Sequence, residues 1–98
     1  MTELLTALEQ TISSLETLRD RQSRPDPQLI RKISDLYDQE QRLLESEISM
    51  ATADYQQATA AMKKAAAKAK TAAADLSDVT GLLNNIAAAI EAVEGLIG

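Results

Sequence analysis

The segment AAMKKAAAKAKTAAADL, residues 60–76, combines alanine with four lysines and lies inside a regular heptad pattern. Its positions Met62, Ala65, Ala69, Ala72 and Leu76 are spaced alternately by three and four residues, the repeat of a coiled-coil contact face. Alanine has the highest helix propensity, and its small side chain lets a second helix approach closely. The segment therefore predicts a helix with a narrow apolar docking face and with lysines on its solvated side.

The same pattern continues in both directions from this segment. Two sets of apolar positions repeat every seven residues from residue 44 to residue 97, without a charged side chain in either set. We call the following residues the heptad seam and expect them to bind a partner helix: Leu44, Ile48, Ala51, Tyr55, Ala58, Met62, Ala65, Ala69, Ala72, Leu76, Leu83, Ile86, Ile90 and Val93.

A proline turn at residues 23–27 is the strongest interruption before the seam. Each proline disfavours helical geometry at the residue before it, and Asp26 followed by Pro27 is a well-suited start for a new helix. The chain before the turn predicts a first helix over about residues 2–22, with one apolar face: Leu5, Leu8, Ile12 and Leu15.

After the turn the chain contains neither glycine nor proline before Gly81, which predicts a long helix from residue 27. Its apolar register shifts near Leu43 and Leu44, which suggests a change of packing partner. Cap and turn residues near 77–81 leave two alternatives open, a further break or a continuous helix. A helix over residues 27–75 alone would measure about 70 Å.

The expected fold is therefore all-α, a single domain over residues 1–98 in the form of an elongated helical hairpin or antiparallel coiled coil. Alanine contributes little apolar area, so a self-sufficient core is not expected. The first helix, about 30 Å long, can cover less than half of that long helix. The rest must meet a final helix, another copy of the chain or a different protein.

Composition argues against catalysis. The chain contains no cysteine and no histidine, and it has no glycine-rich phosphate loop or nucleophile elbow. Carboxylates such as Asp35, Asp38 and Glu40 are expected on a solvated face, because metal sites in helical bundles usually pair Glu with His. Tyr55, in the seam, and Tyr37, at a d position of the repeat before it, are interpreted as large packing residues rather than catalytic hydroxyls. We expect no enzyme activity, no cofactor and no metal.

The charges suggest a protein partner. A net charge of −5 and lysines without interleaved arginine or aromatic residues disfavour nucleic acid. An antiparallel pair of copies, centred between residues 57 and 58, would place Glu47 of one copy opposite Lys68 of the other. We therefore expect the seam to bind another helix, in a homo-oligomer or in a complex with a different protein.

The C-terminal segment GLLNNIAAAIEAVEGLIG, residues 81–98, has the apolar stripe of a membrane-active helix but carries Glu91 and Glu94 where such helices favour lysine or arginine. Docking on a helix is favoured over membrane binding. The start, MTELLTALEQ, lacks the features of a signal peptide, and no segment is apolar enough to span a membrane. A cytoplasmic location is expected, with export by a leaderless route left open.

Two resemblances bear on function. The segment RPDPQLIRKISDLYDQEQRL resembles the proline turn of type III secretion needle subunits through Pro25, Pro27, Leu29, Ile30 and Tyr37. The outline of the whole chain is similar to small leaderless helical proteins of secretion systems, including the WXG100 class, although the Trp-x-Gly turn is absent, and effector-binding chaperones. Both resemblances imply a structural or escort role.

The expected function is thus that of a helical protein-interaction module, in the form of a secretion-associated bacterial chaperone, adaptor or co-secreted partner. A self-assembling filament or oligomer subunit is one alternative. A membrane-active amphipathic helix protein is the other.

Overall fold

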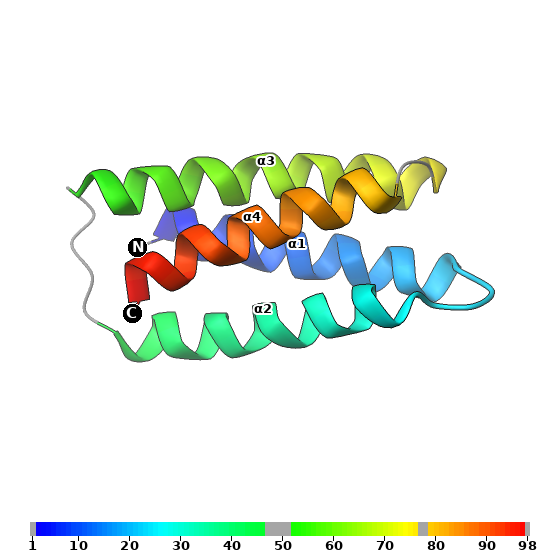
Figure 1. The fold of residues 1–98 in the computed structure, drawn as a ribbon, viewed down its shortest axis with the longest axis horizontal. Coiled ribbons are helices and arrows are strands. Elements are labelled where there is room, and N and C mark those ends of the chain that lie inside the picture. The colour runs from blue at the N-terminus through cyan, green and yellow to red at the C-terminus, as the bar shows by residue number, and fades with distance from the viewer. Residues whose placement is uncertain (1, 47–51, 77–78, 98) are drawn as a thin grey trace.

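A computed structural model describes residues 2–46, 52–76 and 79–97, and these form helices throughout, joined by short connections (Figure 1). The first helix begins and ends within one residue of the predicted bounds 2–22. Because every element of the described residues is an α-helix, the all-α fold class is confirmed. The four helices are α1 (Thr2–Arg21), α2 (Pro27–Glu45), α3 (Ala53–Asp75) and α4 (Val79–Ile97).

The helices form two antiparallel hairpins that lie side by side. α1 packs against α2, and α3 packs against α4. Between the hairpins, α1 packs against α3 and α2 packs against α4, so that α1 and α4 occupy one diagonal of the bundle. In Figure 1, α1 and α3 run in one direction and α2 and α4 in the other. Neighbouring helices of the two hairpins are therefore parallel.

Hydrogen bonds between the hairpins define their register. Four of them join residues that are 51 or 52 positions apart: Leu4 N to Tyr55 Oη at 3.4 Å, Arg21 Nη1 to Ala73 O, Gln39 Nε2 to Ile90 O at 2.8 Å and Arg42 Nη1 to Glu94 Oε1 at 2.8 Å. The separation is the same for the α1–α3 pair and for the α2–α4 pair. The second hairpin is thus stacked on the first with almost no stagger.

The proline turn forms as predicted. Pro27 is the first residue of α2, and the side chain of Asp26 accepts a hydrogen bond of 2.8 Å from the backbone N–H of Gln28. This bond satisfies one of the four N–H groups that a helix start leaves without an intrahelical partner. The predicted cap at Asp26 is confirmed.

The helix expected to continue from residue 27 is instead two helices, α2 and α3. α2 ends at Glu45, and Thr52 caps α3 by accepting a 3.2 Å hydrogen bond from the N–H of Tyr55. The two helices are separated by seven residues, one heptad, so the repeat continues in sequence although the helix does not. Folding back buries apolar surface that a continuous helix would leave in water. The bundle is 41 Å long, well short of the length expected for the continuous helix.

A second break separates α3 from α4. Leu76 adopts a left-handed conformation with φ of 59°, and its N–H donates to the carbonyl of Ala72 at 2.6 Å. α4 begins at Val79. Of the two alternatives for residues 77–81, the break is confirmed, although residues 77 and 78 lie outside the described residues. Leu76 does not lie on the same helical face as the preceding seam residues, because a left-handed residue ends the helix.

Leucines from the first hairpin supply the bulk of the core. Buried alanines of α3 lie in the same apolar cluster, so large side chains of α1 and α2 fill the space beside a narrow helix. This corrects the expectation, drawn from composition, that the chain lacks a core of its own: the leucines of the first hairpin supply the apolar area that alanine does not. The fully buried leucines of the first hairpin are Leu4, Leu8, Leu15, Leu18, Leu29, Leu36 and Leu43.

Candidate interaction surface

Most of the heptad seam lies inside the bundle. Its α3 members are buried in the core cluster, and both α1 and α4 pack against this helix. A second protein cannot contact these side chains while the bundle is closed. The buried seam residues are Tyr55, Ala58, Met62, Ala65, Ala69, Ala72, Leu83, Ile86 and Val93.

The remaining seam residues divide into three groups. Ile90 is half-buried at the edge of the core. Leu44 and Leu76 are exposed, with 62% and 41% of their surfaces accessible. Ile48 and Ala51 lie outside the described residues. The structure therefore brings the α3 and α4 parts of the seam together and leaves Leu44 on the surface.

Leu44 belongs to an exposed apolar row on α2. Ile30 and Tyr37 precede it at intervals of seven residues, and they are 47% and 46% accessible. Residues seven apart lie on nearly the same face of a helix, so the three side chains form one line of about 21 Å. We call Ile30, Tyr37 and Leu44 the α2 ridge. The heptad spacing was visible in the sequence, but it does not tell whether a row faces the core or solvent.

The ridge faces away from the second hairpin and borders α1. Gln39 and Arg42, on another side of α2, make the contacts with α4. Tyr37 instead donates a 2.9 Å hydrogen bond to Glu16 Oε2 of α1. Beside this bond, a shallow groove of about 200 Å³ is lined by side chains of both helices: Glu9, Ile12, Ser13, Glu16, Tyr37 and Glu40.

The groove beside the ridge has an acidic character. Its three glutamates, Glu9, Glu16 and Glu40, come from both helices of the first hairpin. The hydrogen bond to Glu16, with smaller effects from desolvation and from the negative charges of Glu16 and Glu40, raises the pKa of Tyr37. Tyr37 is therefore a neutral donor near pH 7 beside carboxylates. An apolar surface flanked by basic groups would complement it.

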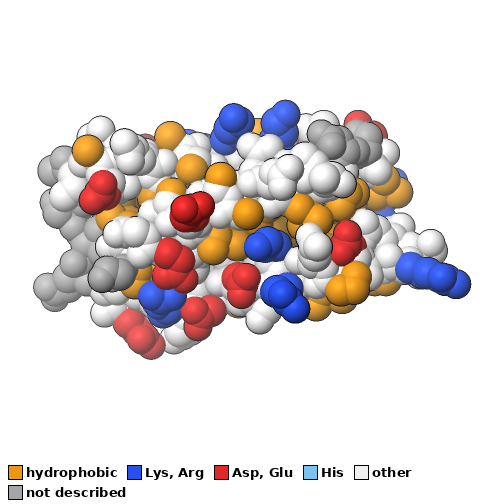
Figure 2. All heavy atoms as spheres, viewed as in Figure 1, with side chains coloured by type: hydrophobic (Ala, Val, Ile, Leu, Met, Phe, Trp, Pro, Cys, Tyr) orange, Lys and Arg blue, Asp and Glu red, His pale blue; other side chains and the backbone are white. Residues whose placement is uncertain are grey.

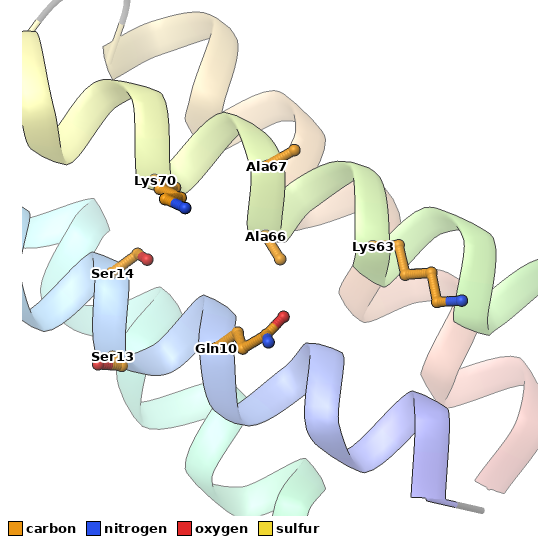
Figure 3. Close-up of a pocket in the computed structure, with 7 residues that line it drawn as sticks. All are labelled: Gln10, Ser13, Ser14, Lys63, Ala66, Ala67 and Lys70. Atoms are coloured by element: carbon orange, nitrogen blue, oxygen red, sulfur yellow. The ribbon is translucent and has the colours of Figure 1, made fainter.

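A larger groove of about 470 Å³ lies between α1 and α3 (Figure 3). Lys63 and Lys70 approach it from α3, and Gln10, Ser13 and Ser14 approach it from α1. Lys63 also forms a 3.7 Å ion pair with Glu3. The groove is open, and its hydroxyl and ammonium groups can solvate a polar or anionic group.

The outer face of the second hairpin combines small side chains with charged side chains of both signs. Its groove of about 190 Å³ contains Ala92 and Gly95, and a side chain built at Gly95 would meet no atom within 4 Å. Asp54, Gln57 and Glu91 complete its lining. Figure 2 shows apolar side chains exposed along the line between α3 and α4, bordered over α3 by basic side chains. This surface is shallow because its residues are small.

An ion-pair network ties α2 to α4. Arg42 contacts Glu94 at 2.8 Å and Asp38 at 3.5 Å. The hydrogen bond to Glu94 and the two nearby carboxylates raise the pKa of the Arg42 guanidinium. The network fixes the side of α2 that faces the second hairpin and leaves the ridge on the other side.

The proposed antiparallel pair of copies involves Glu47, which lies outside the described residues. Its contact face would be the seam, whose α3 side chains are buried in the bundle. Among the described residues, no three Asp or Glu side chains are grouped closely enough to hold a metal ion. No helix formed by the described ranges is both long and apolar enough to cross a membrane.

Comparison with known proteins adds no relative: no protein-family model, curated protein or solved structure matches this chain.

Proposed function

We propose that this chain is a non-enzymatic helical interaction module that binds another protein surface through the α2 ridge. The observation that carries the proposal is the alignment of Ile30, Tyr37 and Leu44. Of the four large hydrophobic side chains that stay exposed among the described residues, these three lie in one row. Contiguous exposed apolar surface on a small protein commonly marks an interaction site.

The ridge is not required by the fold. The core face of α2 consists of Leu29, Ile33, Leu36, Gln39 and Leu43, and these residues already meet α1 and α4. A polar row in place of the ridge would leave that core intact. Apolar side chains here therefore serve a contact outside the closed bundle.

The surroundings of the ridge define the partner's chemistry. Tyr37 presents an aromatic ring of a type enriched at binding hot spots. Glu9, Glu16 and Glu40 beside it would attract basic side chains. The complementary partner is an apolar surface flanked by lysine or arginine.

This site replaces the heptad seam as the binding surface in the proposal. A secretion-associated chaperone or adaptor role is supported only by the helical outline and by the proline turn at residues 23–27. A membrane-active role would require α4 to leave the bundle, because Leu83, Ile86 and Val93 are buried. A self-assembling subunit requires no such opening.

Site-specific photocrosslinking tests the proposed surface. A benzoyl-phenylalanine at position 37 in the full chain should form covalent protein adducts in the cells that make it. The matched control places the same group at Gln28, which is exposed and half a turn around α2 from Tyr37. Leu44→Lys should abolish the adducts of position 37. Equal labelling from positions 37 and 28 would contradict the proposal.

A further inference from the structure

The packing of the two hairpins suggests how a second copy could use the α2 ridge. Inside the chain, the second hairpin stacks on the first with parallel neighbours and with a constant separation of 51 or 52 residues. The parallel pairing of α1 with α3 and of α2 with α4 relates the helix axes of the two hairpins by a shift rather than by a two-fold rotation, and such a shift does not close on itself. Repeating it once more would place the α1–α2 face of a second copy on the outer α3–α4 face of the first.

In that register the side chains are complementary in size. Each ridge residue of one copy falls opposite the residue 51 positions later in the other: Ile30 opposite Gly81, Tyr37 opposite Ala88 and Leu44 opposite Gly95. Ala88 and Gly95 are exposed, and the space beside Gly95 is open. Large side chains would therefore pack against the smallest row on α4. The distance between packed helices depends on the side chains at the contact, and small residues opposite large ones allow a close approach.

The charges are complementary on the α1 side of the same contact. Glu16 lies 52 positions before Lys68, and Glu9 falls near Ala60 and Ala61, within one turn of Lys64. All four charged side chains belong to the chain's two outer faces, acidic on the first hairpin and basic on α3. Exposed ion pairs add little affinity but favour one orientation over others.

One pair opposes the contact. Glu40 lies 51 positions before Glu91, so these two carboxylates would approach each other on the α2–α4 side. This repulsion weakens the association, so a change of charge at position 91 should alter its affinity.

We propose that copies of this chain associate head to tail, with the α2 ridge of one copy seated on the outer α3–α4 face of the next. The inference rests on the proposed function, because it names the partner of the same ridge. Since every copy carries both faces, the association has no built-in end and produces short open stacks. Lys64 and Lys68 of α3 supply the basic groups that complement the acidic groove beside the ridge.

Two complementary variants test the arrangement. Leu44→Lys places a charge in the α2 ridge and Ala88→Lys obstructs the opposite row, and both positions are exposed. The wild-type chain should show a sedimentation mass that rises above 10.6 kDa at concentrations up to about 500 µM, where even weak contacts form. Each variant alone should stay monomeric. An equimolar mixture should form a one-to-one dimer and nothing larger, because only one intact contact remains.

Further variants provide the controls. Gln28→Lys, at an exposed position half a turn around α2 from Tyr37, should associate like the wild-type chain. Glu91→Lys should tighten the association by severalfold, because it replaces repulsion with attraction to Glu40. Circular dichroism establishes that each variant keeps its helices.

A wild-type chain that stays monomeric, a closed dimer that never grows, or a mixture that fails to dimerise would each overturn the head-to-tail contact. The proposed interaction surface and the head-to-tail contact can be refuted independently. If position 37 crosslinks only a different protein while the pure chain is monomeric, the interaction surface stands and the self-contact is wrong. If position 37 crosslinks nothing beyond the control, both are wrong.

Discussion

Substitutions at two alanines of α3 test whether the heptad seam is buried within the chain or open to a partner. Ala69 belongs to the heptad seam and is fully buried, whereas Ala67 is exposed beside the open groove between α1 and α3. Replacing either with leucine makes the same chemical change in the same helix, at nearly the same cost in helix propensity. Only the packing environment differs.

The expected effects differ by the cost of overpacking. A leucine at position 69 must displace neighbours from α1 or α4, which typically costs about 1–3 kcal/mol of the free energy of unfolding. For a domain of this size, about 2 kcal/mol corresponds to a loss of roughly 8–16 °C in Tm. Ala67→Leu has room in the groove and should change the free energy of unfolding by less than about 0.5 kcal/mol.

Urea unfolding followed by circular dichroism measures both variants. The account predicts a lower midpoint for Ala69→Leu at an unchanged m-value, which means lost stability without a change in the surface exposed. If Ala69→Leu were as stable as Ala67→Leu, position 69 would be open to solvent and the buried seam would be wrong.

Three other features of the structure give further predictions. Asp26→Ala should lower the free energy of unfolding by about 1 kcal/mol through loss of the α2 cap, and Asp26→Ser should recover most of it, as urea melts would show. Arg21→Gln removes hydrogen bonds to the last carbonyls of α3 and should cost about 1 kcal/mol, whereas Arg24→Gln, in the exposed turn, should leave the midpoint unchanged. Tyr37 should ionise above the ordinary tyrosine pKa of 10.0 in an ultraviolet titration. Because the folded pKa is raised, this hydrogen bond stabilises the fold fully below the unfolded pKa, and its contribution is lost as pH rises through the folded pKa. Glu16→Gln should bring the pKa of Tyr37 down, and an unchanged value would show that Glu16 is not its cause.

The local signals of the sequence predicted the first turn well. Asp26 and Pro27 each have a strong positional preference, and together they specify a helix start without help from the rest of the chain. The shift of register near Leu43 and Leu44 also coincides with the end of α2. Such features depend on a few neighbouring residues, which is why they can be predicted from sequence.

The break between α2 and α3 could not be read from the heptad pattern. A connection of seven residues preserves the register, so the repeat alone is the same for one helix or two. Thr52 is a suitable cap, but a threonine in a polar stretch is also tolerated within a helix. The break is favoured by the burial of both helices against α1 and α4, which is a property of the whole chain.

Exposure of the ridge was likewise decided by tertiary packing. Leu44 fits the seam by spacing, yet the core face of α2 is set by Leu36, Gln39 and Leu43, which point toward α1 and α4. The buried polar side chain of Gln39 also contradicts a simple apolar pattern, since its amide bonds the carbonyl of Ile90 across the hairpins. The candidate site could therefore be identified only from the folded structure.

Small-angle X-ray scattering of the Leu44→Lys chain, extrapolated to zero concentration, tests most directly whether the seam is buried inside one folded chain. The account predicts a monomer with a radius of gyration close to the 12.8 Å of its Cα atoms. A chain with a continuous helix from residue 27 to residue 75 would behave as a rod of about 70 Å, with a radius of gyration near 20 Å. A radius of gyration near that of the rod would contradict the four-helix bundle and would mean that the seam is exposed.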